Sequence, residues 1–267
     1  MLYMGSIKPQ GKSSISSSEK ETLSIGEVDY AKLYVLVDNH EFDGLSSPWG
    51  ISMLLETPDS IILFDAGPSP EALERNSHKL GIDLSKLDFA VASHEHGDHI
   101  GGFSYIASLT KGLTVYIPRG MAEYSKSGLR GLGLNLVEVE ETRTVAEGVA
   151  VVGELSGPPW EQALAINVKG LGLIVLVGCS HPGVDRIVEK ASKDLGVKPY
   201  AVIGGFHLGG ASEERVRAII ENLKSLGVQK IYPIHCSGER IREILQREYS
   251  ELYGDGHVGT VIKFTSS

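Results

Sequence analysis

Residues 93–102 (SHEHGDHIGG) most strongly constrain the fold, because they follow directly on the apolar segment 87–92 (LDFAVA). A short apolar run bounded by polar residues predicts a buried strand. Burying imidazole and carboxylate groups without partners is costly, so this strand must end where those groups have partners. The chain must therefore fold so that a strand end forms a polar site.

The first half of the chain is rich in predicted strands. Alternating and apolar segments bounded by turn residues predict strands at 31–38, 50–57, 61–67, 87–92 and 113–118. A Ser-Pro start and a closing glycine predict a helix over 69–82, and a second helix is expected to begin near Gly102. The middle segment 136–155 is read as strand–turn–strand.

After residue 160 the pattern becomes regular. Segments 163–170 and 172–178 predict a hairpin. Three units then place a strand before a helix, and a last strand is expected at 259–264; the units are 173–196, 200–227 and 230–249. Such alternation predicts an α/β fold with helix-covered sheets. We expect a flexible lead over residues 1–26 and a single α/β domain over 27–267.

Composition narrows the classes of function. The chain has 267 residues, 42% of them hydrophobic, and a net charge of −9. An acidic chain is poorly suited to non-specific nucleic-acid binding, and no apolar run approaches the ~20 residues of a membrane span. Two cysteines, Cys179 and Cys236, make no disulfide framework and favour a reducing, cytoplasmic compartment.

Histidines end each of the three late strands. His181, His207 and His235 all follow apolar segments. Ligand sites of open α/β sheets lie outside the carboxyl ends of strands, so we expect these residues to converge with 93–102 on one site. For each single histidine the alternative is a packed structural role, and for His207 the choice lies between that and a catalytic role.

Metal binding is the chemistry that the residue types favour. His94 and His96 are two apart in an extended segment, so both side chains face one way and can bind one ion. Asp98 and His99 can face a second ion. The alternative is a solvated polar loop.

Two further residues, Cys179 and Asp65, have two interpretations each. Cys179 is either a thiolate ligand or a small apolar residue that ends a buried strand. Asp65 either orients a ligand by accepting its second N–H or forms a turn before glycine. His40 is a loop residue that could reach the site, and Cys236 is expected to be structural.

The chain resembles the metallo-β-lactamase superfamily over roughly residues 30–265. The resemblance is carried by Asp65 in LFDAG, by HEHGDH at 94–99 before IGG, by GLIVLVGCSH at 172–181 and by IHCSGER at 234–240. It implies a four-layer αββα sandwich with one or two metal ions at one edge.

The resemblance also implies a ligand set. His94 and His96 would bind the first ion, while Asp98, His99 and His235 would bind the second. The chain departs from the family pattern twice: the segment WEQALAIN (160–167) has no histidine, and Cys179 stands where the bridging aspartate would fall. We expect His181 to replace the missing histidine, with Cys179 as a further ligand. Two divalent ions are expected, with zinc favoured over manganese, iron or magnesium.

A narrower resemblance is carried by DNH (38–40), GCSHPG (178–183), GGFHLGG (204–210) and HCSG (235–238). These motifs are similar to enzymes named 7,8-dihydropterin-6-methyl-4-(β-D-ribofuranosyl)-aminobenzene-5′-phosphate synthase, of methanopterin biosynthesis. The motif order also resembles that of transfer-RNA 3′-end endonucleases, in which a histidine like His207 assists the leaving group. The acidic charge argues against that substrate.

Three hypotheses of function follow. The first is a transferase that joins a dihydropterin methyl diphosphate to an arylamine ribose phosphate and releases diphosphate. The second is a metal-dependent hydrolase of phosphodiesters or lactones, and the third is a metal-loaded binding protein without turnover. Asp98 and His207 are the candidate catalytic residues, and Ser237 and Arg240 are candidate contacts to the phosphate of a small substrate.

Overall fold

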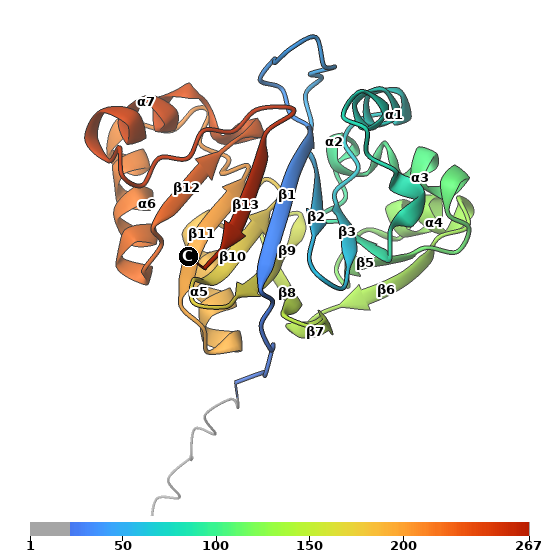
Figure 1. The fold of residues 1–267 in the computed structure, drawn as a ribbon, viewed down its shortest axis with the longest axis horizontal. Helices are drawn as coiled ribbons and strands as arrows, with labels where there is room; N and C mark the ends of the chain where they lie inside the picture. Colours follow the sequence, from blue (N-terminus) through green and yellow to red (C-terminus); the bar gives the residue numbers. More distant parts are fainter. Residues whose placement is uncertain (1–21, 267) are drawn as a thin grey trace, which may run out of the picture.

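Two β-sheets form the centre of the computed structural model, which describes residues 22–266 (Figure 1). The seven strands of the first sheet, in spatial order, are β13 (Val261–Thr265), β1 (Tyr30–Val37), β2 (Ser52–Glu56), β3 (Ile61–Phe64), β4 (Phe89–Val91), β5 (Thr114–Pro118) and β6 (Asn135–Val139). The six strands of the second are β12 (Lys230–Pro233), β11 (Pro199–Gly204), β10 (Gly172–Val177), β9 (Trp160–Val168), β8 (Val149–Ser156) and β7 (Arg143–Ala146).

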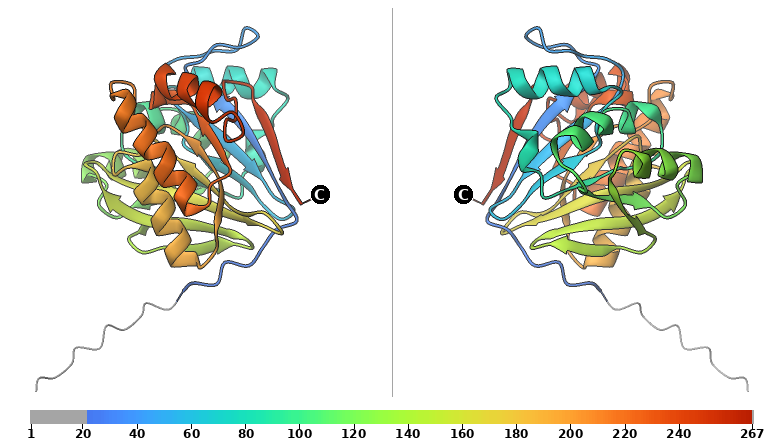
Figure 2. Two further views of the ribbon diagram at one scale, coloured as in Figure 1. Left: turned by 90° about the vertical axis from the view of Figure 1, so that its left-hand side faces the viewer. Right: turned by 90° about the vertical axis from the view of Figure 1, so that its right-hand side faces the viewer.

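Helices cover the outer face of each sheet (Figure 2). Beside the first sheet lie α1 (Pro70–Lys79), α2 (Gly97–Ile100), α3 (Phe103–Leu109) and α4 (Glu123–Gly131). Beside the second lie α5 (Val184–Leu195), α6 (Glu213–Leu226) and α7 (Glu239–Glu248). The four-layer αββα arrangement is therefore confirmed. Among the described helices, none has the length and apolar character needed to cross a membrane.

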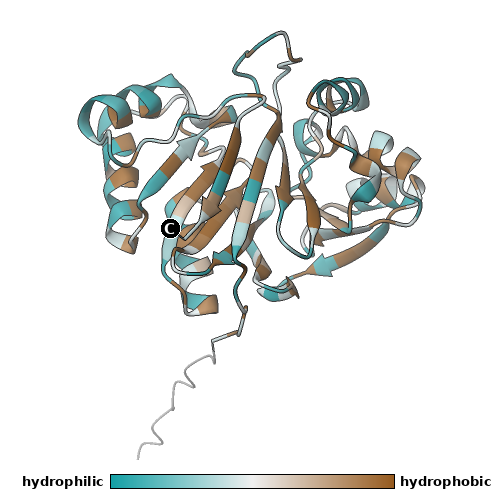
Figure 3. Cartoon of the chain, in the orientation of Figure 1, coloured by the Kyte–Doolittle hydropathy of each residue, from teal (hydrophilic) through white to brown (hydrophobic). Residues whose placement is uncertain are grey.

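The sheets pack face to face through one apolar layer. Alternate residues of β1, such as Leu33 and Val35, point into this layer and meet Leu164 and Ile174 of the second sheet. The strands are accordingly the most hydrophobic parts of the chain (Figure 3). Burying each such side chain contributes about 1.5–3 kcal/mol. This layer therefore fixes the position of one sheet relative to the other, and with it the positions of the strand ends.

The parallel parts of both sheets place the polar motifs together. Strands β3 to β6 run parallel to one another, as do β10 to β12. Asp65 follows β3, residues 93–99 follow β4, Cys179 follows β10, His207 follows β11 and His235 follows β12. Each of these segments therefore lies at the carboxyl end of a parallel strand, where α/β sheets bind ligands.

Most predicted elements are confirmed, with two differences. Segment 136–155 holds three strands, because the chain leaves the first sheet after β6 and enters the second at β7. Apolar alternation is the same in either sheet, so the pattern does not show this crossing. A helical turn, α2, also begins at Gly97, before the predicted start near Gly102.

The sequence predicts a flexible lead over residues 1–26. Of these, residues 1–21 lie outside the described part of the chain. Residues 22–26 instead pack against the second sheet. The Leu23 N–H donates to the Asp194 carbonyl, and the Gly148 N–H donates to the Ile25 carbonyl. Ile25 is buried in the apolar cluster under α5, so residues 22–26 belong to the packed domain.

Candidate metal centre

The histidine-rich motif, expected to be extended from the sequence, bends at its start and then becomes helical. After β4 the backbone bends at His94 and Glu95, His96 is extended, and α2 begins at Gly97. His94 is buried and His96 is exposed, with 3.0 Å between His94 Nε2 and His96 Nδ1. Asp98 and His99 lie within α2, and their side chains point toward Cys179 and His235 instead. The change from strand to helix thus divides one motif between two groups of ligands.

The first group consists of His94, His96 and His181. One ring nitrogen of each lies within 4.8 Å of the others. The ring centre of His181 is 4.8 Å from that of His94 and 4.9 Å from that of His96. The structure therefore places His181, from the loop after β10, where a third ligand is needed.

Glu161 on β9 holds that loop in place. Its fully buried carboxylate accepts hydrogen bonds from the N–H groups of Cys179 (2.9 Å), Ser180 (2.7 Å) and His181 (2.8 Å). The second oxygen also lies 2.9 Å from His181 Nδ1. Because a carboxylate only accepts, Nδ1 carries the proton, which leaves the Nε2 lone pair for a cation.

Glu161 is not among the site residues predicted from the sequence. The available signal is a charged residue near the start of an apolar strand, since a glutamate is almost never fully buried unless it is paired. It lies in the segment 160–167, where the family pattern would place a histidine. In this chain Glu161 thus supports a candidate ligand, His181, in the loop after β10.

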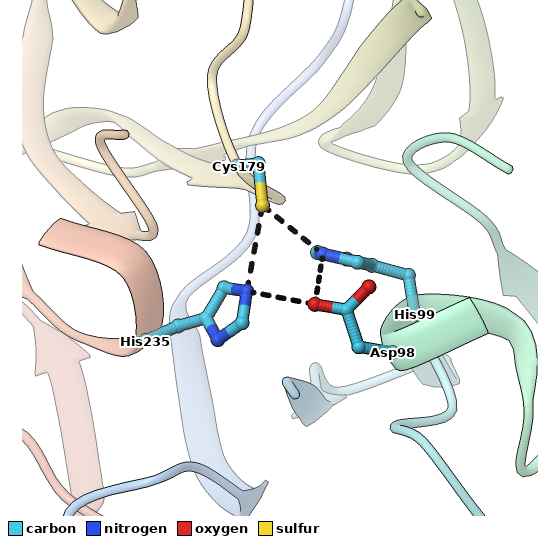
Figure 4. Close-up of side chains that lie close together, drawn as sticks. All are labelled: Asp98, His99, Cys179 and His235. Carbon is cyan, nitrogen blue, oxygen red and sulfur yellow. Dashed lines mark hydrogen bonds and ion pairs between the residues drawn. The ribbon is translucent and has the colours of Figure 1, made fainter. Parts of the chain in front are cut away.

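The second group consists of Asp98, His99, Cys179 and His235 (Figure 4). Cys179 Sγ lies 3.2 Å from His99 Nε2 and 3.4 Å from His235 Nε2. Asp98 Oδ2 lies 3.7 Å from His99 Nε2 and 3.4 Å from His235 Nε2. Segments after three different strands supply these four side chains.

These distances fit a tetrahedral cation. Nitrogen, oxygen and sulfur ligands bind zinc at about 2.0–2.3 Å, so the edges of such a tetrahedron are about 3.3–3.8 Å long. Of the six edges, three have lengths of 3.4, 3.4 and 3.7 Å, within this range, and a fourth, at 3.2 Å, lies just below it. The side chains present therefore form a suitable metal site.

Two histidines of the second group are oriented through their other ring nitrogen. His99 Nδ1 lies 2.7 Å from Asp65 Oδ2, which is the orienting role considered for Asp65. His235 Nδ1 lies 3.2 Å from Asn39 Oδ1, and the His235 N–H donates to Asp38 Oδ1 at 2.7 Å. These bonds turn both Nε2 atoms toward Cys179. Residues 38–39 thus have a structural role that the sequence motif alone does not reveal.

The charges of the site suit cation binding. Burial lowers the pKa of His94 well below its ordinary value, and the neighbouring imidazoles act in the same direction. Burial also opposes protonation of His99, but Asp65 raises the pKa of this ring. For Asp98, burial opposes ionisation, yet the hydrogen bond from His235 and the charge of His99 lower its pKa to about 2. At neutral pH His94 is therefore neutral and Asp98 is a carboxylate, the forms that bind metals.

His207 lies beside the first group. It is exposed, its ring centre is 4.7 Å from that of His181, and its φ of 52° is uncommon for a residue other than glycine. Cys179, His207 and Cys236 form a third group with ligand atoms within 4.8 Å. A hydrogen bond with Cys236 raises the pKa of His207, although burial opposes this shift. Cys236, expected to be only structural, therefore also contacts the site.

The side chains of the two candidate phosphate contacts, Ser237 and Arg240, bond to backbone groups of neighbouring loops. Ser237 is buried; its hydroxyl accepts from the Phe206 N–H at 3.0 Å and donates to the Ile234 carbonyl at 2.7 Å, so it ties the loop together. The Arg240 guanidinium donates to the Ala211 carbonyl. Neither side chain belongs to the groups of possible metal-binding residues.

The His40 side chain does not join the ligand groups; it bonds to two carboxylates outside them. Its Nδ1 lies 2.8 Å from Asp38 Oδ2, and its Nε2 lies 2.7 Å from Glu239 Oε1. Asp38 holds the His235 backbone, so His40 links the loop after β1 to the start of α7.

Fold and site together define a metal-dependent enzyme of the α/β class. The model of the Metallo-beta-lactamase superfamily matches residues 51–192. A Methanocaldococcus jannaschii protein named 7,8-dihydropterin-6-methyl-4-(beta-D-ribofuranosyl)-aminobenzene-5′-phosphate synthase is 30% identical over 91% of this chain and 99% of its own length. The chain belongs to the metallo-β-lactamase superfamily.

Two further comparisons complete this placement. A solved structure described as a metal-dependent hydrolase of the β-lactamase superfamily is 26% identical, with a TM-score of 0.76 over 88% of this chain and 100% of that one. Ribonuclease Z from Listeria innocua is 35% identical over 39% of this chain and 35% of its own length. Membership of a superfamily of metal-dependent enzymes favours the two catalytic hypotheses over a binding protein without turnover.

Proposed function

We propose that this enzyme joins a dihydropterin methyl diphosphate to an arylamine ribose phosphate. The arylamine nitrogen forms a bond to the methylene carbon, the carbon–oxygen bond to diphosphate breaks, and an amine proton passes to a base. The observation that carries this proposal is the 30% identity with the synthase from M. jannaschii over almost the whole of both chains. The paired ligand groups support it, because diphosphate is a strongly charged leaving group.

Two zinc ions are the proposed cofactors. His94, His96 and His181 would hold one, and Asp98, His99, Cys179 and His235 the other. When bound, the ions supply positive charge that holds the diphosphate and stabilises the charge that it gains as it leaves.

The chain's own residues have separate roles in this scheme. Glu161 keeps the His181 proton on Nδ1, and Asp65 orients the His99 ring. Asp98, with a pKa of about 2, stays ionised and contributes charge; it does not carry a proton. His207 is exposed beside His181, so its imidazole is the group placed to move a proton between the amine and the leaving group.

The test measures diphosphate release by the zinc-loaded enzyme. We expect release only when both substrates are present, and His207→Gln should lower kcat about 10²–10⁴-fold, the usual contribution of a general acid or base. Arg217→Gln, on the exposed face of α6, serves as the control variant. Diphosphate release that does not depend on the arylamine would refute the transferase.

The second candidate is a hydrolase with the same ligands. It is supported by the 26% identical structure that is described as a metal-dependent hydrolase. Water would then replace the arylamine as the attacking group. Turnover of bis-p-nitrophenyl phosphate or of a lactone, without any second substrate, would favour this function.

A further inference from the structure

A cavity of about 220 Å³ opens beside His181 and His207. The loop after β10, the loop after β11 and the first turns of α6 form its walls. Phe206, Leu208 and Ile219 give it an apolar side. Because His181 belongs to the first ligand group, a molecule that reaches the metal centre could extend into this cavity.

The polar side chains of the cavity wall are nitrogen bases and one hydroxyl, and its one permanent charge is that of Arg215. His181, His207 and Arg215 line it, and none of the described residues that line it carries a carboxylate. This is unexpected in a chain with a net charge of −9. A wall that carries the guanidinium of Arg215 and no carboxylate favours an anion.

Arg215 is the strongest of these groups. In the described part of the chain its guanidinium makes no ion pair, and it is the Arg215 backbone N–H that donates a hydrogen bond, to Ser212 Oγ at 3.3 Å. Arg217, two residues further along α6, is held instead by Glu213 at 2.9 Å and Glu248 at 2.8 Å. Arg215 is thus left able to bind a ligand, and a guanidinium matches the geometry of phosphate oxygens.

The start of α5 lies on the same wall. Gly183 and Val184 line the cavity, and no side chain caps this 12-residue helix. Asp185, the acidic residue of its first turn, does not line the cavity; it accepts a hydrogen bond from Asn222 at 2.8 Å. The positive end of the helix dipole adds to the charge of Arg215, and the Asp185 carboxylate beside Gly183 offsets part of it.

We propose that this cavity binds a terminal phosphate group of the substrate, with Arg215 as its charged contact. The proposal rests on the proposed function, because it takes the substrates to be phosphorylated. The group comes either from the ribose phosphate of the arylamine or from the far end of the diphosphate. The apolar side of the cavity suits the carbon skeleton next to a ribose phosphate.

Calorimetric titration of the zinc-loaded protein with ribose 5-phosphate and with inorganic diphosphate tests this site. Loss of a charge-assisted hydrogen bond in Arg215→Gln should raise the Kd of one ligand about tenfold or more. Arg217→Gln removes the same charge from the same helix and should change neither Kd more than about twofold. Arg215→Lys should restore part of the affinity, because it keeps the charge.

The two ligands identify the source of the phosphate. A selective loss of ribose 5-phosphate binding assigns the cavity to the arylamine, and a selective loss of diphosphate binding assigns it to the leaving group. Equal effects of Arg215→Gln and Arg217→Gln on both ligands, or no effect of either, would overturn the proposal. Binding is measured without turnover, so a failed diphosphate-release assay alongside a selective Arg215→Gln effect would refute the reaction and leave the site in place.

Discussion

The Glu161→Gln substitution removes one acceptor from a buried carboxylate that receives hydrogen bonds from three backbone N–H groups and one imidazole. The side chain keeps its size, but one oxygen becomes an NH₂ group. If the remaining oxygen keeps the Cys179 and Ser180 N–H groups, the NH₂ group faces His181. This NH₂ group then faces the backbone N–H of His181, so two donors meet. To accept from the same NH₂ group, His181 Nδ1 must lose its proton.

The magnitude follows from these contacts. A buried donor without a partner costs about 1–3 kcal/mol, so we expect the free energy of unfolding of the metal-free protein to fall by that amount. The change of tautomer moves the His181 proton to Nε2, the atom that faces His94 and His96. Loss of such an orienting partner lowers metal affinity about 10–100-fold.

Metal content after dialysis at fixed free zinc, measured by mass spectrometry, is the assay. We expect two ions in the unmodified protein and one in the Glu161→Gln variant. Glu154→Gln is a matched control, because Glu154 accepts one backbone hydrogen bond, from Gly120, and contacts none of the ligands. If Glu161→Gln binds both ions as tightly as the control does, the tautomer argument is wrong.

Three further predictions concern the same region. Cys179→Ser should weaken the second ion and remove the sulfur-to-metal absorption of a cobalt-substituted sample; an unchanged spectrum would show that Cys179 is not a ligand. Because Asp38 raises the pKa of His40, protonated His40 stabilises the fold below about pH 6.5, and this contribution is lost as the pH rises through its folded pKa. His40→Gln should therefore flatten that part of the dependence of Tm on pH, and a curve of unchanged shape would contradict this. Chelation should lower Tm and added zinc should restore it, since ligands that bind only the native state stabilise it by mass action; a Tm insensitive to the chelator would refute metal-linked stability.

The location of the site could be predicted from the sequence because it depends on local patterns. Apolar segments that end in histidine mark strand ends, and strands that alternate with helices imply a parallel arrangement. These two rules place residues 94–99, His181, His207 and His235 on one edge before any contact is known. The division of residues 94–99 into two candidate ligand groups depends on the short spacing within this motif.

The supporting residues could not be predicted because their partners are distant in the chain. Asp38 lies 197 positions from His235, and Glu161 lies 20 from His181 on a different strand. Nothing in a window around either acid shows which N–H groups it accepts. The hydroxyl of Ser237 likewise could not be classed as buried, because the turn after β12 depends on its contact with the Phe206 backbone.

The second ligand group also bears on the order of events during folding. Its contacts join positions that are 80 and 56 residues apart, and its members follow strands of both sheets. An unfolded chain cannot present them together, so these large loops must be closed by the packing of the sheets before a cation finds its full coordination. A cation bound there would then act as a late cross-link, and its release would loosen the junction between the two halves of the chain.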